Sequence, residues 1–128
     1  MKKPIHYTDT QIYRLCIDLS NFLVWLADTM RKQLYPIYGN SLLDNMNQMQ
    51  INFAKSYVLT DINSKLKLAQ LSNENLLNIS LILTNYFHIN GINCNNKRQI
   101  EVCRMVGTLQ EQIKNWIRTL ENKAQGQI

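Results

Sequence analysis

The sequence predicts an all-α protein, folded as an up-down-up-down antiparallel four-helix bundle. Apolar residues recur at spacings of three and four in four successive segments, which is the periodicity of helices with one buried face. Glycine and proline are scarce, with 4 and 2 in 128 residues, which argues against an all-β fold rich in tight turns. Because the connections are short, the helices are expected to pack around one core, as a single domain spanning residues 1–128. They are expected at about residues 8–32, 41–58, 61–89 and 96–123.

The first helix has a start signal and a stop signal. Thr8 and Gln11 have the spacing of a capping box, in which two side chains satisfy free backbone N–H groups at the helix start. The segment YPIYG should end the helix, because Pro36 disfavours a helical residue before it and Gly39 supplies a flexible turn. The apolar stripe between these signals consists of Ile12, Leu15, Leu19, Phe22, Leu23, Leu26 and Met30.

The second and third helices are separated by a short break at LTDINS. Asn40 or Ser41 is expected to cap the second helix, and Thr60 and Asp61 are cap candidates for the third. Gly91 suits a left-handed stop after the third helix. The second stripe is Leu42, Met46, Met49, Phe53 and Tyr57; the third is Leu66, Ala69, Leu76, Ile79, Leu83, Tyr86 and Phe87.

The fourth helix carries a tryptophan on its apolar side. Trp116 falls on the stripe formed by Ile100, Cys103, Val106, Leu109, Ile113 and Leu120. A residue in that position is expected to be mostly buried, in the core or at an interface. Stacking on a nucleic-acid base is disfavoured for Trp116, because a stacking residue should stand on a basic face.

Basic charge collects on the fourth helix of a chain whose net charge is +5. The candidate nucleic-acid-binding residues are Lys97, Arg98, Arg104, Lys114 and Arg118. Arg104, Lys114 and Arg118 fall roughly on one line opposite the apolar stripe. One interpretation of this line is a solvated face that is stabilised by ion pairs such as Glu111 with Lys114. The other is a phosphate-binding ridge, because Lys114 and Arg118 are like charges one turn apart and such a pair is mildly unfavourable without an anion between them.

The third helix is unusually poor in charge. Glu74 is the one formally charged residue in residues 68–96. A neutral polar face suits burial against another subunit, where a charge is costly and amides can pair. Asn75, Asn78 and Asn85 are therefore candidate oligomer-interface residues, with an ordinary asparagine-rich wet surface as the alternative.

Signals for catalysis are poor, and an enzyme is not expected. The sequence lacks glycine-rich phosphate loops and nucleophile motifs, so neither catalytic residues nor a cofactor is predicted. His88 and Cys94 are too few and too loosely spaced for a zinc site, so no metal is predicted. Cys16, Cys94 and Cys103 suggest no disulfide pairing, and neither a signal peptide nor a membrane span is evident. A cytoplasmic protein with reduced thiols is expected.

The order of these elements resembles one protein family. The resemblance lies in a leading amphipathic helix, the YPIYG turn, a helix ending in INFAKSY, a long third helix and a final EQIKNWIRTL. With these elements, the chain resembles the four-helix-bundle family that contains the accessory variability determinant (Avd) proteins of diversity-generating retroelements. Proteins encoded in intervening sequences of 23S ribosomal RNA genes are relatives. The resemblance covers about residues 12–120. Gln112, Ile113 and Trp116 match the most specific stretch, whereas Glu111, Lys114 and Asn115 depart from it.

The resemblance implies a function that composition does not. Avd-like proteins are non-catalytic partners of a reverse transcriptase, form homopentamers, and bind template RNA or RNA/DNA hybrid through a basic surface to support mutagenic copying. Relatives often carry basic residues on the third helix, so here the fourth helix is expected to contribute more, together with Arg31, Lys32, Lys55, Lys65 and Lys67. The alternative is a ribosome-associated or generic protein-interaction bundle.

Overall fold

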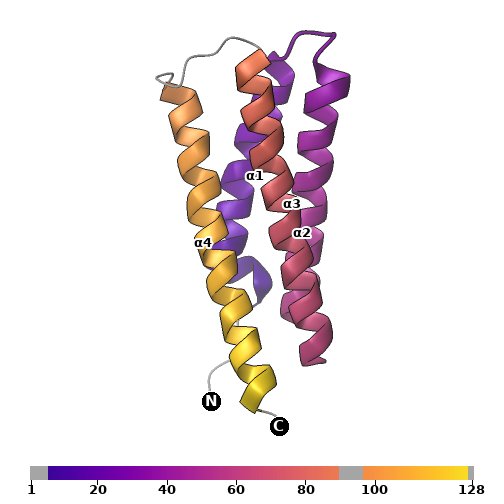
Figure 1. The fold of residues 1–128 in the computed structure, drawn as a ribbon, viewed down its shortest axis with the longest axis vertical. Coiled ribbons are helices and arrows are strands. Elements are labelled where there is room, and N and C mark those ends of the chain that lie inside the picture. The colour runs from indigo at the N-terminus through magenta and orange to yellow at the C-terminus, as the bar shows by residue number, and fades with distance from the viewer. Residues whose placement is uncertain (1–5, 90–96, 127–128) are drawn as a thin grey trace.

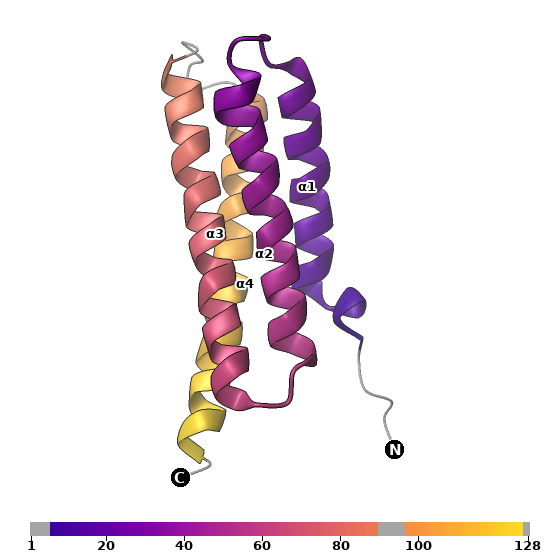
Figure 2. The ribbon, with the colours of Figure 1, turned by 90° about the vertical axis from the view of Figure 1, so that its right-hand side faces the viewer.

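A computed structural model describes residues 6–89 and 97–126, and it confirms the four-helix bundle (Figure 1). Successive helices run in opposite directions and pack side by side, as the turned view also shows (Figure 2). Neither stretch contains a β-strand, and none of their helices has the length and apolar character needed to cross a membrane. The helices are α1 (Gln11–Thr29), α2 (Asn40–Val58), α3 (Ile62–Ile89) and α4 (Lys97–Gly126).

The start of α1 differs from the capping box that the sequence suggested. Thr10, and not Thr8, is the cap: its hydroxyl oxygen accepts a hydrogen bond of 3.2 Å from the backbone N–H of Tyr13. Thr8 lies in a single 3₁₀ turn, Tyr7–Asp9, where its hydroxyl pairs with the His6 ring. Thr10 prevails because its extended backbone, with ψ of 153°, is the conformation that aims a cap side chain at the first helical N–H groups.

The segment YPIYG does not break the chain into a loop. It forms a π-helical turn, Tyr35–Gly39, that runs directly into α2. The predicted side-chain cap at Asn40 or Ser41 is therefore wrong: the backbone N–H of Asn40 donates to the Tyr35 carbonyl instead. Gly39 is right-handed, with φ of −61°, so conformational freedom is not its role. A Cβ there would lie 2.6 Å from Cδ2 of Tyr35, so glycine admits the tyrosine ring.

The break between α2 and α3 is confirmed, and Asp61 is its cap. The Asp61 carboxylate accepts hydrogen bonds from the backbone N–H and the hydroxyl of Ser64, at 3.0 and 2.7 Å. These bonds stabilise the charged form and lower the pKa of Asp61. Lys65 closes the other side of the break, because its ammonium donates to the Tyr57 carbonyl at 3.2 Å.

One core runs the length of the bundle, and the predicted stripes of α1, α2 and α3 supply most of it. The register at the start of α4 differs from the prediction. Val102 is fully buried there, whereas Ile100 is 44% exposed and Cys103 is exposed. The buried line of α4 is Val102, Val106, Leu109, Ile113 and Leu120, and Val102 and Leu120 are 18 residues apart, which is about five full turns, so its ends lie on one side of the helix.

Trp116 packs against the core but is half-buried. Its indole N–H donates to the hydroxyl oxygen of Ser56 at 3.1 Å. The ring centroid lies 5.7 Å from that of Tyr57, and the Lys65 ammonium lies 5.7 Å from the ring. Trp116 therefore joins α4 to the ends of α2 and α3.

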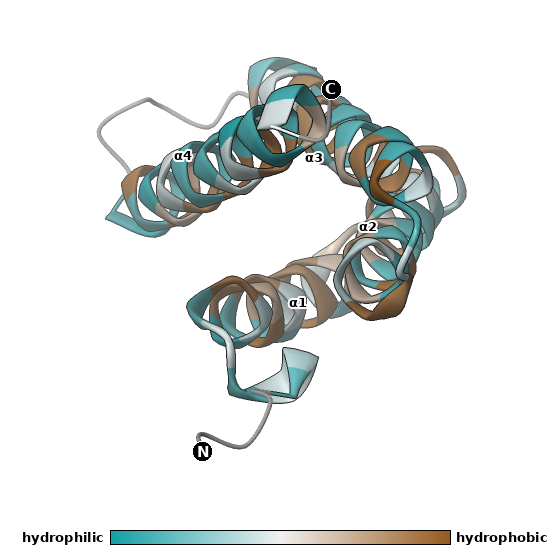
Figure 3. Cartoon of the chain, turned by 90° about the horizontal axis from the view of Figure 1, so that it is seen from below, coloured by the Kyte–Doolittle hydropathy of each residue, from teal (hydrophilic) through white to brown (hydrophobic). Residues whose placement is uncertain are grey.

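The helices follow one another around the core, which places α1 and α4 at the two ends of the row (Figure 3). The α2–α3 pair packs most extensively, and α1 makes sparser contacts with both α2 and α4. Helix α1 is therefore the least extensively packed of the four helices.

Candidate functional site

The candidate basic residues all lie on α4, and the spacing of Arg104, Lys114 and Arg118 along the helix sets how they share its surface. Arg104 and Arg118 are 14 residues apart, close to four turns, so they share one side of the helix about 21 Å apart. Lys114 is one turn beyond Gln110, which faces α3. All three are exposed, and within residues 6–89 and 97–126 they make no hydrogen bond or ion pair. The proposed pairing of Glu111 with Lys114 therefore does not form.

Arg98 is engaged with α1. Its guanidinium carbon lies 4.7 Å from the centroid of the Trp25 ring, a cation–π distance. Trp25 is 42% exposed and packs edge-on against Phe22, with centroids 5.5 Å apart. Arg98 thus links α4 to α1 near the start of α4, and it is a weaker candidate for phosphate binding than the exposed cations.

Lys97 and Arg104 border an open groove of about 530 Å³ between α1 and α4. Its other lining residues are Leu15, Ile100, Glu101, Met105 and Thr108. The groove combines an apolar floor with two cations and one carboxylate. An apolar floor offers phosphate oxygens neither hydrogen bonds nor charge, so this composition also fits a bound protein segment. Such a segment is what the alternative of a protein-interaction bundle requires.

The asparagines of α3 divide into two groups. Asn75 accepts a hydrogen bond of 2.8 Å from Asn52 of α2 and donates to Asn45 at 3.4 Å, while Asn78 donates to Asn45 at 3.2 Å. Asn75 and Asn78 therefore join α3 to α2 within one chain. Asn85 is exposed. Sequence reasoning missed Asn45 and Asn52, whose seven-residue spacing on α2 was the available signal.

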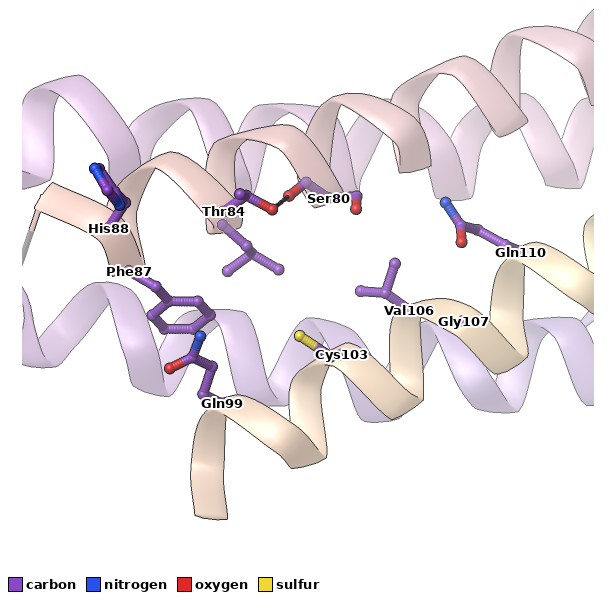
Figure 4. Close-up of a pocket in the computed structure, with 10 residues that line it drawn as sticks. Ser80, Thr84, Phe87, His88, Gln99, Cys103, Val106, Gly107 and Gln110 are labelled. Atoms are coloured by element: carbon purple, nitrogen blue, oxygen red, sulfur yellow. Dashed lines mark hydrogen bonds between the residues drawn. The ribbon is translucent and has the colours of Figure 1, made fainter. Parts of the chain in front are cut away.

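A second cavity, of about 290 Å³, lies between α3 and α4 (Figure 4). Ser80 and Thr84 line its α3 side, and Cys103 lies on its α4 side. Gln99 and Gln110 stand at its two ends. Leu83, Phe87 and Val106 supply apolar surface, and Gly107 and His88 complete the lining. This cavity was not predictable from the sequence, since its residues come from two helices whose mutual register is set only on folding.

The described residues offer little for metal or thiol chemistry. No group of three metal-ligating side chains gathers within 6–89 and 97–126. His88 is exposed at the end of α3, and Cys94 lies outside the described residues. Burial raises the pKa of the Cys16 thiol to about 12, so this cysteine is inert at neutral pH. Cys103 is the described thiol that solvent reaches.

Comparison of the chain with known protein families, curated proteins and solved structures gave no match.

Proposed function

We propose that this protein is a non-catalytic accessory protein of a diversity-generating retroelement, which binds nucleic acid and a reverse transcriptase in the cytoplasm to support mutagenic copying of template RNA. The observation that carries the nucleic-acid part is the set of exposed cations on α4. Arg104, Lys114 and Arg118 have no carboxylate partner in the described part of the chain. Their charge is therefore available to phosphates.

The retroelement part of the proposal rests on the resemblance of the final helix, in which Gln112, Ile113 and Trp116 match the family pattern. The same resemblance suggests a homopentamer. Assembly would multiply a modest surface charge, because each chain contributes a net charge of +5. Asn78 and Asn85 are the exposed candidate amides of α3, and Asn85 is the one that is not hydrogen-bonded to Asn45 of α2.

Phosphate contacts predict strong salt dependence and weak sequence dependence. The exposed cations carry point charges and guanidinium forks, which hold phosphates but do not read bases. For single-stranded RNA, each contact contributes about 0.7 to the slope of log affinity against log salt concentration. Losing all three contacts should lower that slope by about 2.

The test reverses Arg104, Lys114 and Arg118 to Glu and measures RNA binding by fluorescence anisotropy over a salt series. A matched control uses exposed residues outside the predicted binding set: Arg14 and Lys123 are reversed to Glu, and Asn21 and Gln48 are replaced by Glu. Either set of changes takes the net charge from +5 to −1. We expect the α4 variant to lose binding and the control to keep most of it, with unchanged helicity and particle size. Equal losses would show that total charge, and not this surface, governs binding.

One observation favours the alternative of a protein-interaction bundle. The groove between α1 and α4 holds the exposed Ile100 and the partly buried Met105 beside Lys97 and Arg104. If the α4 triple variant binds RNA as tightly as the wild type, this groove becomes the better candidate site, and its partner is a protein.

A further inference from the structure

The cavity between α3 and α4 has an uncharged lining. Among the described residues that form it, none carries a carboxylate, ammonium or guanidinium group. It offers hydroxyls from Ser80 and Thr84, amides from Gln99 and Gln110, and an apolar surface that includes the Phe87 ring (Figure 4). Apart from the His88 imidazole, a charged ligand would find no cationic or carboxylate group here. A neutral ligand with hydrogen-bonding edges and a flat apolar face would find partners for both.

Gly107 keeps one wall of the cavity open. It lies inside the 30-residue helix α4, where glycine is less favourable than alanine. A Cβ at this position would meet no atom within 4 Å, so no close contact within the chain requires glycine. The absent side chain leaves backbone surface exposed beside Cys103, which a flat molecule can approach.

Gln99 supplies a second sign of an incomplete site. Its carbonyl oxygen is buried and accepts no hydrogen bond from any described residue. Buried polar atoms without a partner are rare in folded proteins because they forfeit their hydrogen bonds to water. A ligand N–H group that reached this oxygen would supply the missing bond.

The volume limits the ligand to a small one. Pockets for drug-sized ligands span about 300–1,000 Å³, and this cavity, at about 290 Å³, lies just below that range. Amides at both ends present donors as well as acceptors. A single heterocycle with donors and acceptors on its edge satisfies these constraints.

We propose that the α3–α4 cavity binds one unpaired nucleobase. The proposal deepens the proposed function and in part rests on it, because Lys114 lies one turn beyond Gln110 on the same side of α4, where it can hold a phosphate of the same strand. Unpaired bases in RNA are recognised in this way, by stacking on aromatic rings and by hydrogen bonds to their edges. The base can belong to bound RNA or to a free nucleoside.

Cys103 provides the readout, because its exposed thiol lies in the cavity wall. Cys94 is replaced by Ser, and Cys16 is fully buried with its pKa raised to about 12, so a thiol reagent reports Cys103 alone. The rate of Cys103 modification is measured with adenosine, cytidine, guanosine or uridine. A nucleoside at ten times its Kd leaves about one-eleventh of the cavities free, so the rate should fall about tenfold.

A second arm separates the two sources of the base. An unpaired RNA oligomer is compared with an abasic oligomer of equal length and charge, with binding followed by anisotropy. Protection of Cys103 by the first and not by the second assigns the base to RNA. Protection by nucleosides alone assigns the cavity to a free heterocycle. If RNA binds but neither RNA nor any nucleoside protects Cys103, the cavity proposal is overturned while the proposed function stands. If nucleosides protect Cys103 but the protein does not bind RNA, the cavity proposal stands and the proposed function is overturned. If there is neither protection of Cys103 nor RNA binding, both proposals are overturned.

Variants at Gly107 test whether the cavity itself is responsible. Gly107→Phe should fill the opening and abolish nucleoside binding in calorimetry. Gly107→Ala, whose methyl group meets nothing, should retain it. Thr119→Phe is the matched control, because Thr119 is exposed and lies about 18 Å along α4 from Gly107. Circular dichroism and melting confirm that each variant folds. Nucleoside binding that survives Gly107→Phe in a folded protein places the ligand elsewhere.

Discussion

The hydrogen bond between Ser56 and Trp116 fixes the lower half of α4 on α2, and its contribution to stability can be isolated. Ser56 is fully buried. Its hydroxyl donates to the Phe53 carbonyl at 2.7 Å and accepts the Trp116 indole N–H at 3.1 Å. Ser56→Ala leaves that N–H without its protein partner. An unsatisfied buried donor costs about 1–3 kcal/mol, and the half-buried indole places the expected loss at about 1–2 kcal/mol.

Ser72 provides the matched control. It is also fully buried in a helix, and its hydroxyl donates to the Met49 carbonyl at 3.3 Å, but no side chain donates to it. Both Ser→Ala changes raise helix propensity equally, so that gain cancels in the comparison. Ser56→Ala should therefore lower the free energy of unfolding by about 1 kcal/mol more than Ser72→Ala.

A double-mutant cycle makes the test specific. Trp116→Phe removes the indole N–H, so Ser56→Ala in that background should cost no more than Ser72→Ala does. The four proteins are unfolded in urea at one protein concentration, because oligomerisation makes stability depend on concentration. We expect a coupling energy of about 1 kcal/mol between Ser56 and Trp116. A coupling below about 0.3 kcal/mol, which is the usual scatter of additive sites, would refute the role given to this bond.

Three further predictions follow from particular residues. Gly107→Ala should stabilise the protein by about 0.5–1 kcal/mol, and an unchanged or lower melting temperature would contradict the open space found there. Hydrogen bonds lower the folded-state pKa of Asp61, so the Asp61 carboxylate stabilises the fold above its ordinary pKa of 3.8, and this stabilisation is lost as pH falls through the folded-state pKa. In acid unfolding, the stability of Asp61→Asn should therefore fall less than that of the wild type over the same pH range. Asn85→Lys should reduce the particle mass in light scattering, whereas Asn115→Lys on α4 should not; a wild type that runs at the 15.0 kDa of one chain would exclude a stable oligomer.

The sequence was informative about helices and their buried sides because that information is local. Three- and four-residue spacings identify a core face whatever the helix packs against, so most of the residues expected in the core are buried. The errors fall where two local signals compete. Thr8 and Thr10 are both plausible caps, and only the backbone conformation selects Thr10. Ile100 and Val102 are both apolar, and the rotation of α4 decides which of them faces the core.

The candidate sites were less predictable because they depend on how helices face one another. Asn45 and Asn75 are 30 residues apart, and their hydrogen bond requires a particular offset between α2 and α3. Trp25 and Arg98 meet only because the end of α1 lies beside the start of α4. The same limitation applies to the α3–α4 cavity. Its one signal in the sequence is Gly107, a glycine in the interior of a helix and away from any turn.

Two of the exposed cations of α4, Arg104 and Lys114, have different surroundings. Arg104 borders the groove with α1, which has an apolar floor, whereas Lys114 follows the uncharged cavity with α3. Cations that flank two different surfaces are not interchangeable, although they contribute equally to net charge. Arg104 has neighbours suited to a polymer or a protein segment lying along the helix, and Lys114 lies one turn beyond Gln110, which lines the cavity. Under the proposed function, one helix would hold the phosphate backbone and select a base, because its successive side chains point in different directions around its axis.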